Sequence, residues 1–216
     1  MGVIEGASVS DERESRRALV QAGYDRMAGQ YLASKRPLDP EAETLLERLL
    51  EGVSAGSPVL DLGCGAGVPL TQWLAARRPV VGVDLSLRQL LLARLHVPCA
   101  NLIQADMAEI DFPSGSFGAI VAMYAIIHTP RELHRSLLES IYRWLQPGGR
   151  FLATWPVNDW EGEEGDWSGW GAPMWWSHFG RDTNLSLVES AGFSIDVARD
   201  RHGEESWAWV LARKPV

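Results

Sequence analysis

The chain has 216 residues, of which 46% are hydrophobic and 22% are charged, and its formal net charge is −8 at pH 7. This length allows one α/β domain of ordinary size, and the acidic balance without any Lys/Arg run excludes a nucleic acid as the main partner. No apolar stretch approaches the ~18 residues of a membrane span, and the N-terminus is charged. We therefore expect a cytoplasmic protein with no membrane partner.

The first fifty residues have helical patterns. Apolar side chains recur on one face from Val20 to Tyr31. The pair Asp39-Pro40 is typical of a helix start, with leucines continuing to Leu50. We expect residues 1–52 to form a helical cap on a core that spans residues 53–216, with one domain overall.

Strand and helix patterns alternate from residue 58 onward. Apolar runs predict strands at 58–62, 79–83, 101–105, 117–122 and 150–155. Helical patterns lie between them at 68–77, 86–95 and 129–144. This alternation is typical of right-handed crossovers in a parallel sheet.

The tail of the chain follows another pattern, with a helix expected at 183–191 and strands at 193–199 and 206–213. The short turn between these strands permits only antiparallel pairing. Because the last strand is apolar on both faces, we expect it inside the sheet. The predicted fold is α/β and Rossmann-like: a seven-stranded, mostly parallel sheet with an antiparallel last strand and helices on both faces.

A glycine turn follows the first strand, with the spacing Gly63-x-Gly65-x-Gly67. Glycine adopts backbone angles closed to other residues and lets a ligand approach the main chain. The dinucleotide fingerprint would place its third glycine at Val68, so a nicotinamide-dependent oxidoreductase is disfavoured, while a purely structural turn stays open.

Asp84 ends the second strand. A carboxylate there can accept hydrogen bonds from the two hydroxyls of a ribose. Its alternative role is to cap the next helix, but Ser86 is better placed for that. The turn and Asp84 together predict a site for the adenosine end of a cofactor.

Four segments resemble, in order and spacing, the motifs of class I S-adenosylmethionine-dependent methyltransferases: VLDLGCGAG, VVGVDLS, NLIQADMAEIDFPSGSFGAIVAMYAIIHTP and LQPGGRFLATW. The likeness is to the small-molecule branch (methyltransferase type 11), which includes quinone-biosynthesis enzymes. Tyr24-Asp25-Arg26-Met27-Ala28, with Tyr31 after it, is similar to the segment that precedes the core in that branch. The resemblance covers about residues 20 to 155.

The resemblance implies S-adenosylmethionine as cofactor and S-adenosylhomocysteine as its product. It implies these contacts: Asp61, Gly63 and Gly65 at the methionine end, Gly67 in support of the turn, Asp84 on the ribose, Leu85 and Met107 against the adenine, Asp106 on the adenine amino group, and Tyr24 and Tyr31 over the sulfonium and carboxylate. It also places Cys64, Gln89, Ala105 and Met123 beside the cofactor. Simple packing remains an alternative for Met107 and Tyr24.

The acceptor side is expected at 123–130, which faces the transferable methyl group in this fold. Enzymes that methylate nucleobase amino groups carry Asn/Asp-Pro-Pro-Tyr/Phe there, whereas this chain has Met123-Tyr124-Ala125. His128 is the candidate general base, and Tyr124 is a second catalytic candidate. The alternative for His128 is a loop residue bonded to the backbone before Thr129.

Six of the ten tryptophans lie between residues 155 and 176. Indole faces suit a flat or apolar acceptor, so we expect 156–180 to be an insertion on the acceptor side. The candidate substrate contacts are Trp155, Trp170, Trp175, Trp176 and His178. The alternative is that these indoles only cap the sheet. No His/Cys/Asp/Glu set has metal-ligand spacing, so no metal is expected.

The sequence thus predicts a methyltransferase that acts on a small aromatic or hydrophobic molecule, as a monomer or homodimer. Two alternatives remain open. One is an enzyme of the same fold that catalyses a cyclisation or rearrangement, and the other is a non-catalytic cofactor-binding protein.

Overall fold

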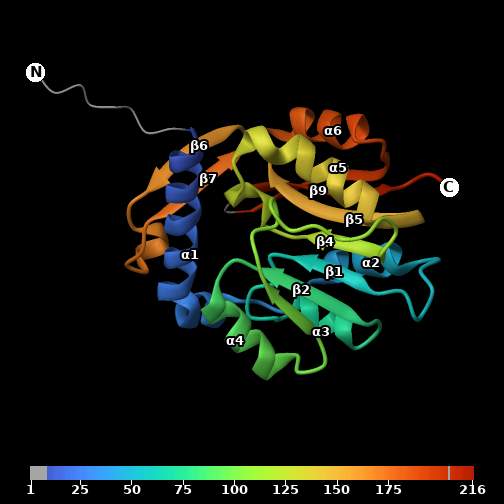
Figure 1. Ribbon diagram of the computed structural model, residues 1–216, viewed down its shortest axis with the longest axis horizontal. Coiled ribbons are helices and arrows are strands. Elements are labelled where there is room, and N and C mark those ends of the chain that lie inside the picture. Colours follow the sequence, from blue (N-terminus) through green and yellow to red (C-terminus); the bar gives the residue numbers. More distant parts are fainter. Residues whose placement is uncertain (1–8, 204) are drawn as a thin grey trace, which may run out of the picture.

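The computed structural model describes residues 9–203 and 205–216, and its centre is a seven-stranded sheet (Figure 1). In spatial order the strands are β3 (Asn101–Gln104), β2 (Val80–Asp84), β1 (Val59–Leu62), β4 (Phe117–Ala122), β5 (Leu145–Pro156), β9 (Ser206–Arg213) and β8 (Ser194–His202). The first five are parallel, and β9 is antiparallel to both of its neighbours. The predicted Rossmann-like sheet, with its last strand inside, is confirmed.

Helices cover both faces because the central strands are apolar on both sides. Leu60 and Leu62 of β1 face α5 (His134–Trp144) and α6 (Arg181–Ser190). Val59 faces α2 (Pro40–Leu50) and α3 (Leu70–Ala75). Every residue of β1 and β4 is buried, as expected for parallel strands covered on both faces. This core holds the carboxyl ends of β1, β2 and β4 in fixed positions.

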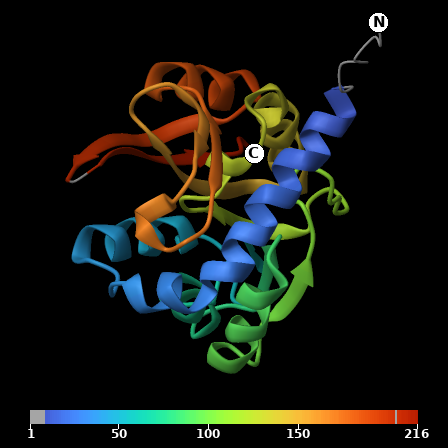
Figure 2. The same ribbon diagram turned by 90° about the vertical axis from the view of Figure 1, so that its left-hand side faces the viewer.

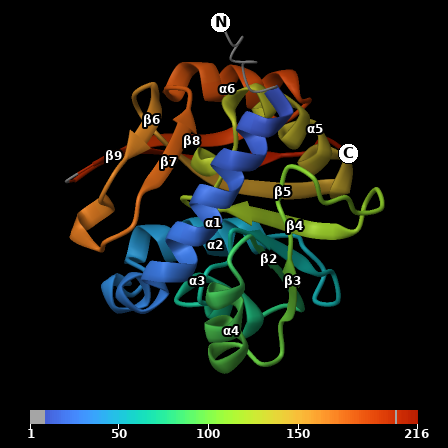
Figure 3. The same cartoon turned by 60° about the vertical axis from the view of Figure 1, so that its left-hand side comes forward.

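The helix α1 (Val9–Ser34) lies across the carboxyl edge of the sheet, as Figures 2 and 3 show. It is held on α4 (Leu87–His96) by Asp25, whose carboxylate accepts hydrogen bonds from the Ser86 hydroxyl at 2.6 Å and the Arg88 amide at 3.0 Å. The part of the predicted cap at residues 1–8 lies outside the described residues. The described part of α1 brings Tyr24 above the strand ends.

The tryptophan-rich segment contains a hairpin that the sequence did not indicate. Strand β6 (Trp160–Glu164) pairs antiparallel with β7 (Met174–His178) in a separate two-stranded sheet, with the short 3-10 turn η3 (Trp167–Gly169) between them. Trp175 and Met174 pack against Val20 and Met27 of α1. The hairpin therefore supports α1 from the side opposite α4.

Two helices begin later than the sequence patterns predict. The helix expected from residue 129 begins at His134, preceded by the 3-10 turns η1 (Ile126–His128) and η2 (Arg131–Leu133). The residue before a proline avoids the helical region, and Thr129 before Pro130 is extended, with φ −86° and ψ 136°. The helix expected from Val68 begins at Leu70, after Pro69.

No helix within residues 9–203 and 205–216 combines the length and the apolar character needed to cross a membrane.

Candidate functional site

A cavity of about 890 Å³ lies at the carboxyl ends of the central strands, beneath α1. Most of the residues expected to bind a cofactor line it: Tyr24, Tyr31, Asp61, Gly63, Cys64, Gly65, Asp84, Leu85, Gln89, Ala105, Asp106, Met107 and Met123. The catalytic candidates Tyr124 and His128 line it too. The fold thus gathers residues from the whole first two thirds of the chain around one space.

The glycine turn brings main chain to the cavity wall. Gly63 has φ +75°, and a Cβ there would lie 2.4 Å from the Cβ of Ala125. Gly65 has φ +54° and donates its amide hydrogen to Asp84 at 2.8 Å. Gly67 packs against Val97 and Ala93 and supports the turn from behind the cavity. Both the close approach and the left-handed backbone require glycine at position 63.

Two carboxylates line the cavity, Asp61 fully buried and Asp84 partly buried, and desolvation raises the pKa of each. The pKa of Asp84 is raised to about 6, although its carboxylate accepts from the amides of Ser86 and Gly65. The pKa of Asp61 is raised to about 7, although it accepts a 2.7 Å hydrogen bond from the Thr71 hydroxyl. Each oxygen of Asp84 keeps a second lone pair, which can accept a hydroxyl of a ligand.

Gln89 supplies the strongest sign that a polar ligand fits this space. Its side chain is buried, and neither its amide nitrogen nor its amide oxygen has a hydrogen-bond partner. Its oxygen would lie 3.8 Å from a Cβ at Gly65. A buried amide with no partner is costly, so a ligand that can both donate and accept hydrogen bonds would satisfy it. A ribose meets this requirement.

Tyr24 and His128 form a hydrogen-bonded pair across the cavity. The Tyr24 hydroxyl lies 2.8 Å from His128 Nε2, and His128 Nδ1 lies 2.8 Å from the carbonyl oxygen of Trp175. A carbonyl only accepts, so Nδ1 carries the ring proton and Nε2 accepts the hydrogen bond from Tyr24. The Tyr24 oxygen accepts nothing from His128, so its lone pairs remain for other donors, of which the neighbouring Tyr31 hydroxyl is one.

Burial keeps this pair neutral. It lowers the pKa of His128 to about 4, and the nearby His178 lowers it further. Burial also raises the pKa of Tyr24, with Tyr31 and Asp84 adding to the effect. His128 is accordingly an unprotonated imidazole at neutral pH, and Tyr24 is a protonated phenol.

Tyr124 lies at the end of β4 in a strained conformation, with φ +57°. Its amide donates to the Thr154 hydroxyl at 2.8 Å, and its ring packs edge-on against Trp207 at 4.6 Å. A non-glycine residue in this backbone region is held there by its surroundings, and such residues cluster at functional sites.

The predicted substrate contacts lie behind the cavity wall. Trp155, Trp170, Trp175, Trp176 and His178 are absent from the described residues that line the cavity. Trp155 belongs to the main core, Trp175 packs under α1, and Trp176 stacks on His128 at 4.5 Å. Trp170 lies 6.2 Å from the ring of Tyr31, and the Nδ1 of His178 is buried without a partner. Trp170 and Trp176 thus pack against Tyr31 and His128, and none of the five side chains lines the cavity.

The sequence did not single out several residues that line the cavity, among them Lys35, Arg36, Leu38, Leu46 and Trp209. Lys35 was detectable, because it follows Tyr31 by about one helical turn, and its ammonium lies 3.7 Å from the Tyr31 ring centre. Trp209 lies on the last strand. The apolar pattern of that strand is explained by burial in the core, so no separate sign in the sequence indicated that Trp209 lines the cavity. Within the described part of the chain, no three His, Cys, Asp or Glu side chains are grouped so as to hold a metal ion.

Comparison with known proteins finds a likeness to methyltransferases over the part of the chain that carries this site. The family model described as a methyltransferase domain matches residues 59–149. Methyltransferase GfsG of Streptomyces halstedii is 33% identical over 156 residues, which make up 66% of this chain and 55% of that protein. The chain spans about half the length of the first curated relatives that it matches.

Two solved structures share the fold over nearly all of the chain. One is 1,6-didemethyltoxoflavin-N1-methyltransferase of Burkholderia thailandensis, with bound 1,6-didemethyltoxoflavin and S-adenosylhomocysteine. Its TM-score is 0.71 at 17% identity, covering 99% of this chain and 94% of that one. The other is the [4+2]-cyclase SpnF, with a TM-score of 0.64 at 20% identity, covering 100% of this chain and 99% of that one. At these identities the likeness concerns the fold alone.

Proposed function

We propose that this chain is a class I S-adenosylmethionine-dependent methyltransferase and that it methylates a small aromatic or hydrophobic molecule. One observation carries the proposal. A single cavity joins Asp84 and the orphaned amide of Gln89 to the Tyr24–His128 pair and to apolar walls beyond it. The polar part suits the cofactor, and the apolar remainder suits a small acceptor.

The polar part of the cavity would hold the cofactor by contacts with its own residues. Asp84 would accept from the ribose hydroxyls, and Gln89 would bond the same sugar. Asp106, whose carboxylate accepts from the Ala108 amide at 2.9 Å, would face the adenine amino group, with Met107 against the ring. Asp61 and the glycine turn would hold the methionine end. When bound, the cofactor supplies an electrophilic methyl group.

Tyr24 and His128 would take up the proton that the acceptor loses on methylation. Because the Tyr24 hydroxyl donates to His128 Nε2, its oxygen can accept a hydrogen bond from an acceptor hydroxyl or amine. A proton released by the acceptor passes to the Tyr24 oxygen as the Tyr24 proton passes to Nε2. With its pKa lowered to about 4 in the free protein, His128 is a weak base and would hold the proton only transiently; the carbonyl of Trp175 fixes the ring that receives it. Tyr124 would face the acceptor from the end of β4.

Calorimetry on the whole chain tests the cofactor assignment. S-adenosylhomocysteine should bind, and NAD should not. Binding of NAD without binding of S-adenosylhomocysteine would overturn the proposal.

Two substitutions test the proton route. With a hydroxyl acceptor, both Tyr24→Phe and His128→Ala should slow turnover by ~10²-fold. For His128→Ala, the affinity for S-adenosylhomocysteine is measured in parallel. An unchanged affinity shows that the cofactor site is intact and that the loss of turnover is catalytic. Turnover that is unchanged in both variants would show that the pair is structural.

A further inference from the structure

Part of the cavity lies beyond the proposed cofactor contacts. We call it the α2 sector and define it by its lining residues Leu38, Asp39, Ala42, Leu46, Leu70, Met123, Tyr124 and Trp209. The first four come from α2 and the residues before it, and Trp209 comes from β9. The sector therefore lies between the first helices of the chain and its last strand.

Strand order would place this sector beside the methyl end of a bound cofactor. Asp84 ends β2, the glycine turn follows β1, Met123 follows β4, and Trp209 lies on β9 beyond β5. The cofactor would run from its ribose at Asp84 along the glycine turn toward Met123. Any molecule that meets it end-on must approach from the side of Met123 and Trp209.

Apart from Asp39 at its edge and the Tyr124 hydroxyl, the side chains of the α2 sector are apolar, and three of them are almost fully buried. Leu46 is 1% exposed, Ala42 2% and Trp209 4%. The Trp209 ring also meets Tyr124 edge-on, with 6.2 Å between ring centres. A wall of leucine, methionine and indole favours a flat apolar body over a charged one.

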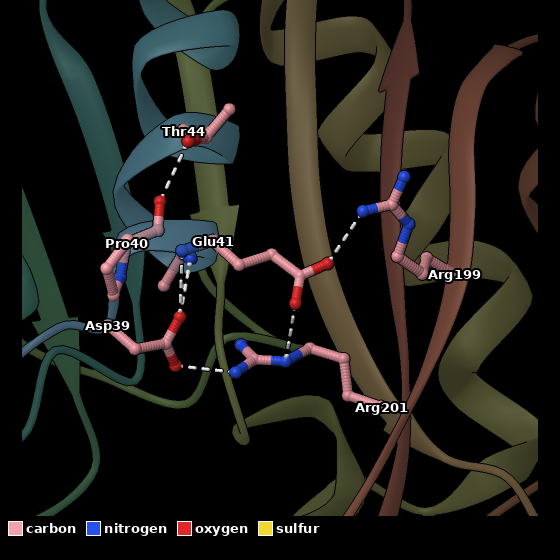
Figure 4. A network of polar contacts seen from close by, with 7 residues as sticks. Asp39, Pro40, Glu41, Thr44, Arg199 and Arg201 are labelled. Carbon is pink, nitrogen blue, oxygen red and sulfur yellow. Dashed lines mark hydrogen bonds and ion pairs between the residues drawn. The ribbon is translucent and has the colours of Figure 1, made fainter.

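Arg201 connects the two walls of the sector (Figure 4). Its guanidinium donates to Asp39 at 2.6 Å and lies 3.4 Å from Glu41, both at the start of α2. The same guanidinium stacks over the Trp209 ring, 4.6 Å from its centre. Arg199 adds a second tie to Glu41 at 2.8 Å. One side chain thus holds the start of α2 at a fixed distance from the indole of β9.

We propose that the α2 sector binds the apolar body of the acceptor, with Trp209 as a specificity-determining residue and Arg201 as a positioning residue that sets the width of the sector. The inference rests on the proposed function, since it locates the acceptor of the same reaction. The proposed acceptor has a flat apolar ring system and a nucleophilic group at one edge.

The first experiment uses 2-naphthol as the probe, because it is flat and apolar and carries one hydroxyl. Its dissociation constant is measured by ligand-observed NMR on the whole chain saturated with S-adenosylhomocysteine. Trp209→Leu should weaken 2-naphthol binding roughly tenfold and leave S-adenosylhomocysteine affinity unchanged. Trp73→Leu is the matched control, since Trp73 also carries a stacked arginine, Arg77 at 3.7 Å, but is not among the lining residues.

The outcomes separate this proposal from the proposed function. Failure of wild type to bind S-adenosylhomocysteine counts against the proposed function, and 2-naphthol binding can still be measured on the free chain. Failure of wild type to bind 2-naphthol, or equal losses in the Trp209 and Trp73 variants, overturns the α2 sector as the acceptor site. If Trp209→Leu does not fold, Trp209→Phe serves in its place, with a smaller loss expected.

The second experiment tests Arg201. Arg201→Gln should weaken 2-naphthol binding roughly fivefold without changing S-adenosylhomocysteine affinity, and Arg201→Lys should recover part of the loss because it restores the charge. Arg213→Gln is the control, because Arg213 pairs with Asp196 at 3.5 Å on the same pair of strands and is not among the lining residues. An unchanged affinity in Arg201→Gln, or the same loss in Arg213→Gln, would contradict the positioning role.

Discussion

Asp61 should lower the free energy of unfolding of the cofactor-free protein at alkaline pH relative to acidic pH. The Asp61→Asn substitution should remove this loss of stability. Asp61 is buried, and desolvation raises its pKa from 3.8 to about 7. Its only hydrogen bond among those described comes from Thr71, and an asparagine oxygen can accept the same bond. The substitution thus removes a buried charge with little change of shape.

The magnitude follows from the difference between the folded and unfolded pKa values. Each pH unit of difference is worth about 1.4 kcal/mol. Because the folded state holds the Asp61 proton more tightly, stability falls as the pH rises from 3.8 to about 7 and is constant above that. The cost is about 1.6 kcal/mol at pH 5 and about 4 kcal/mol at pH 8. The stability of Asp61→Asn relative to wild type should therefore rise by about 3 kcal/mol between these values.

Urea denaturation without cofactor, at pH 5 and at pH 8, measures this difference. Comparing variant with wild type at each pH cancels the titrating groups that do not interact with Asp61 and any fixed cost of the amide; Asp84, which does interact with Asp61, is part of the measured difference. Asp182→Asn is the control, since the Asp182 side chain is 93% exposed and its ion pair with Arg181 lies at the surface. A stability difference between Asp61→Asn and wild type that is the same at both pH values would refute the reasoning.

Three further predictions concern the proposed cofactor site. Asp84→Ala should weaken S-adenosylhomocysteine binding by roughly 1–3 kcal/mol in calorimetry, because two ribose hydroxyls lose a charged acceptor, and an unchanged affinity would remove that role. Since burial raises the pKa of Asp84 to about 6 and that of Asp61 to about 7, the wild-type affinity should fall as the pH drops from 8 to 5; the part of the fall that is absent in Asp84→Asn belongs to Asp84, and an equal fall in Asp84→Asn would assign the effect elsewhere. Gly63→Ala should lower stability by about 2 kcal/mol or more, because its Cβ meets Ala125, whereas Gly115→Ala, at φ +70° with open space around it, should cost about 1 kcal/mol in thermal denaturation.

The sheet and the glycine turn were predictable because their signals are local. Continuous apolar runs identify β1 and β4, and the double-faced apolar pattern of residues 206–213 places β9 inside the sheet. Gly63 and Asp84 lie at the ends of neighbouring strands, so their proximity follows from strand order alone. In the cofactor half of the site, the sequence pattern of each segment therefore predicts the same arrangement that the fold shows.

The acceptor half was less predictable because it depends on how distant segments pack. The contact between Tyr24 and His128 joins residues 104 positions apart and exists only because α1 crosses the strand ends. The hairpin of β6 and β7 carries glycine and acids where an alternating strand pattern is expected, so its pairing was missed. Composition alone does not distinguish an indole packed behind the cavity wall, such as Trp176, from one that lines the cavity, such as Trp209.

Transfer of a labelled methyl group tests the central claim most directly. The whole chain is incubated with S-adenosylmethionine labelled on the methyl carbon and a panel of flat apolar acceptors, including 2-naphthol, with Asp84→Ala as the matched control. Label should appear in a small-molecule product, in amounts equal to the S-adenosylhomocysteine formed, and far more slowly with Asp84→Ala. Conversion of an acceptor without any label in the product, while S-adenosylmethionine remains intact, would contradict methyl transfer and favour a rearranging enzyme of the same fold.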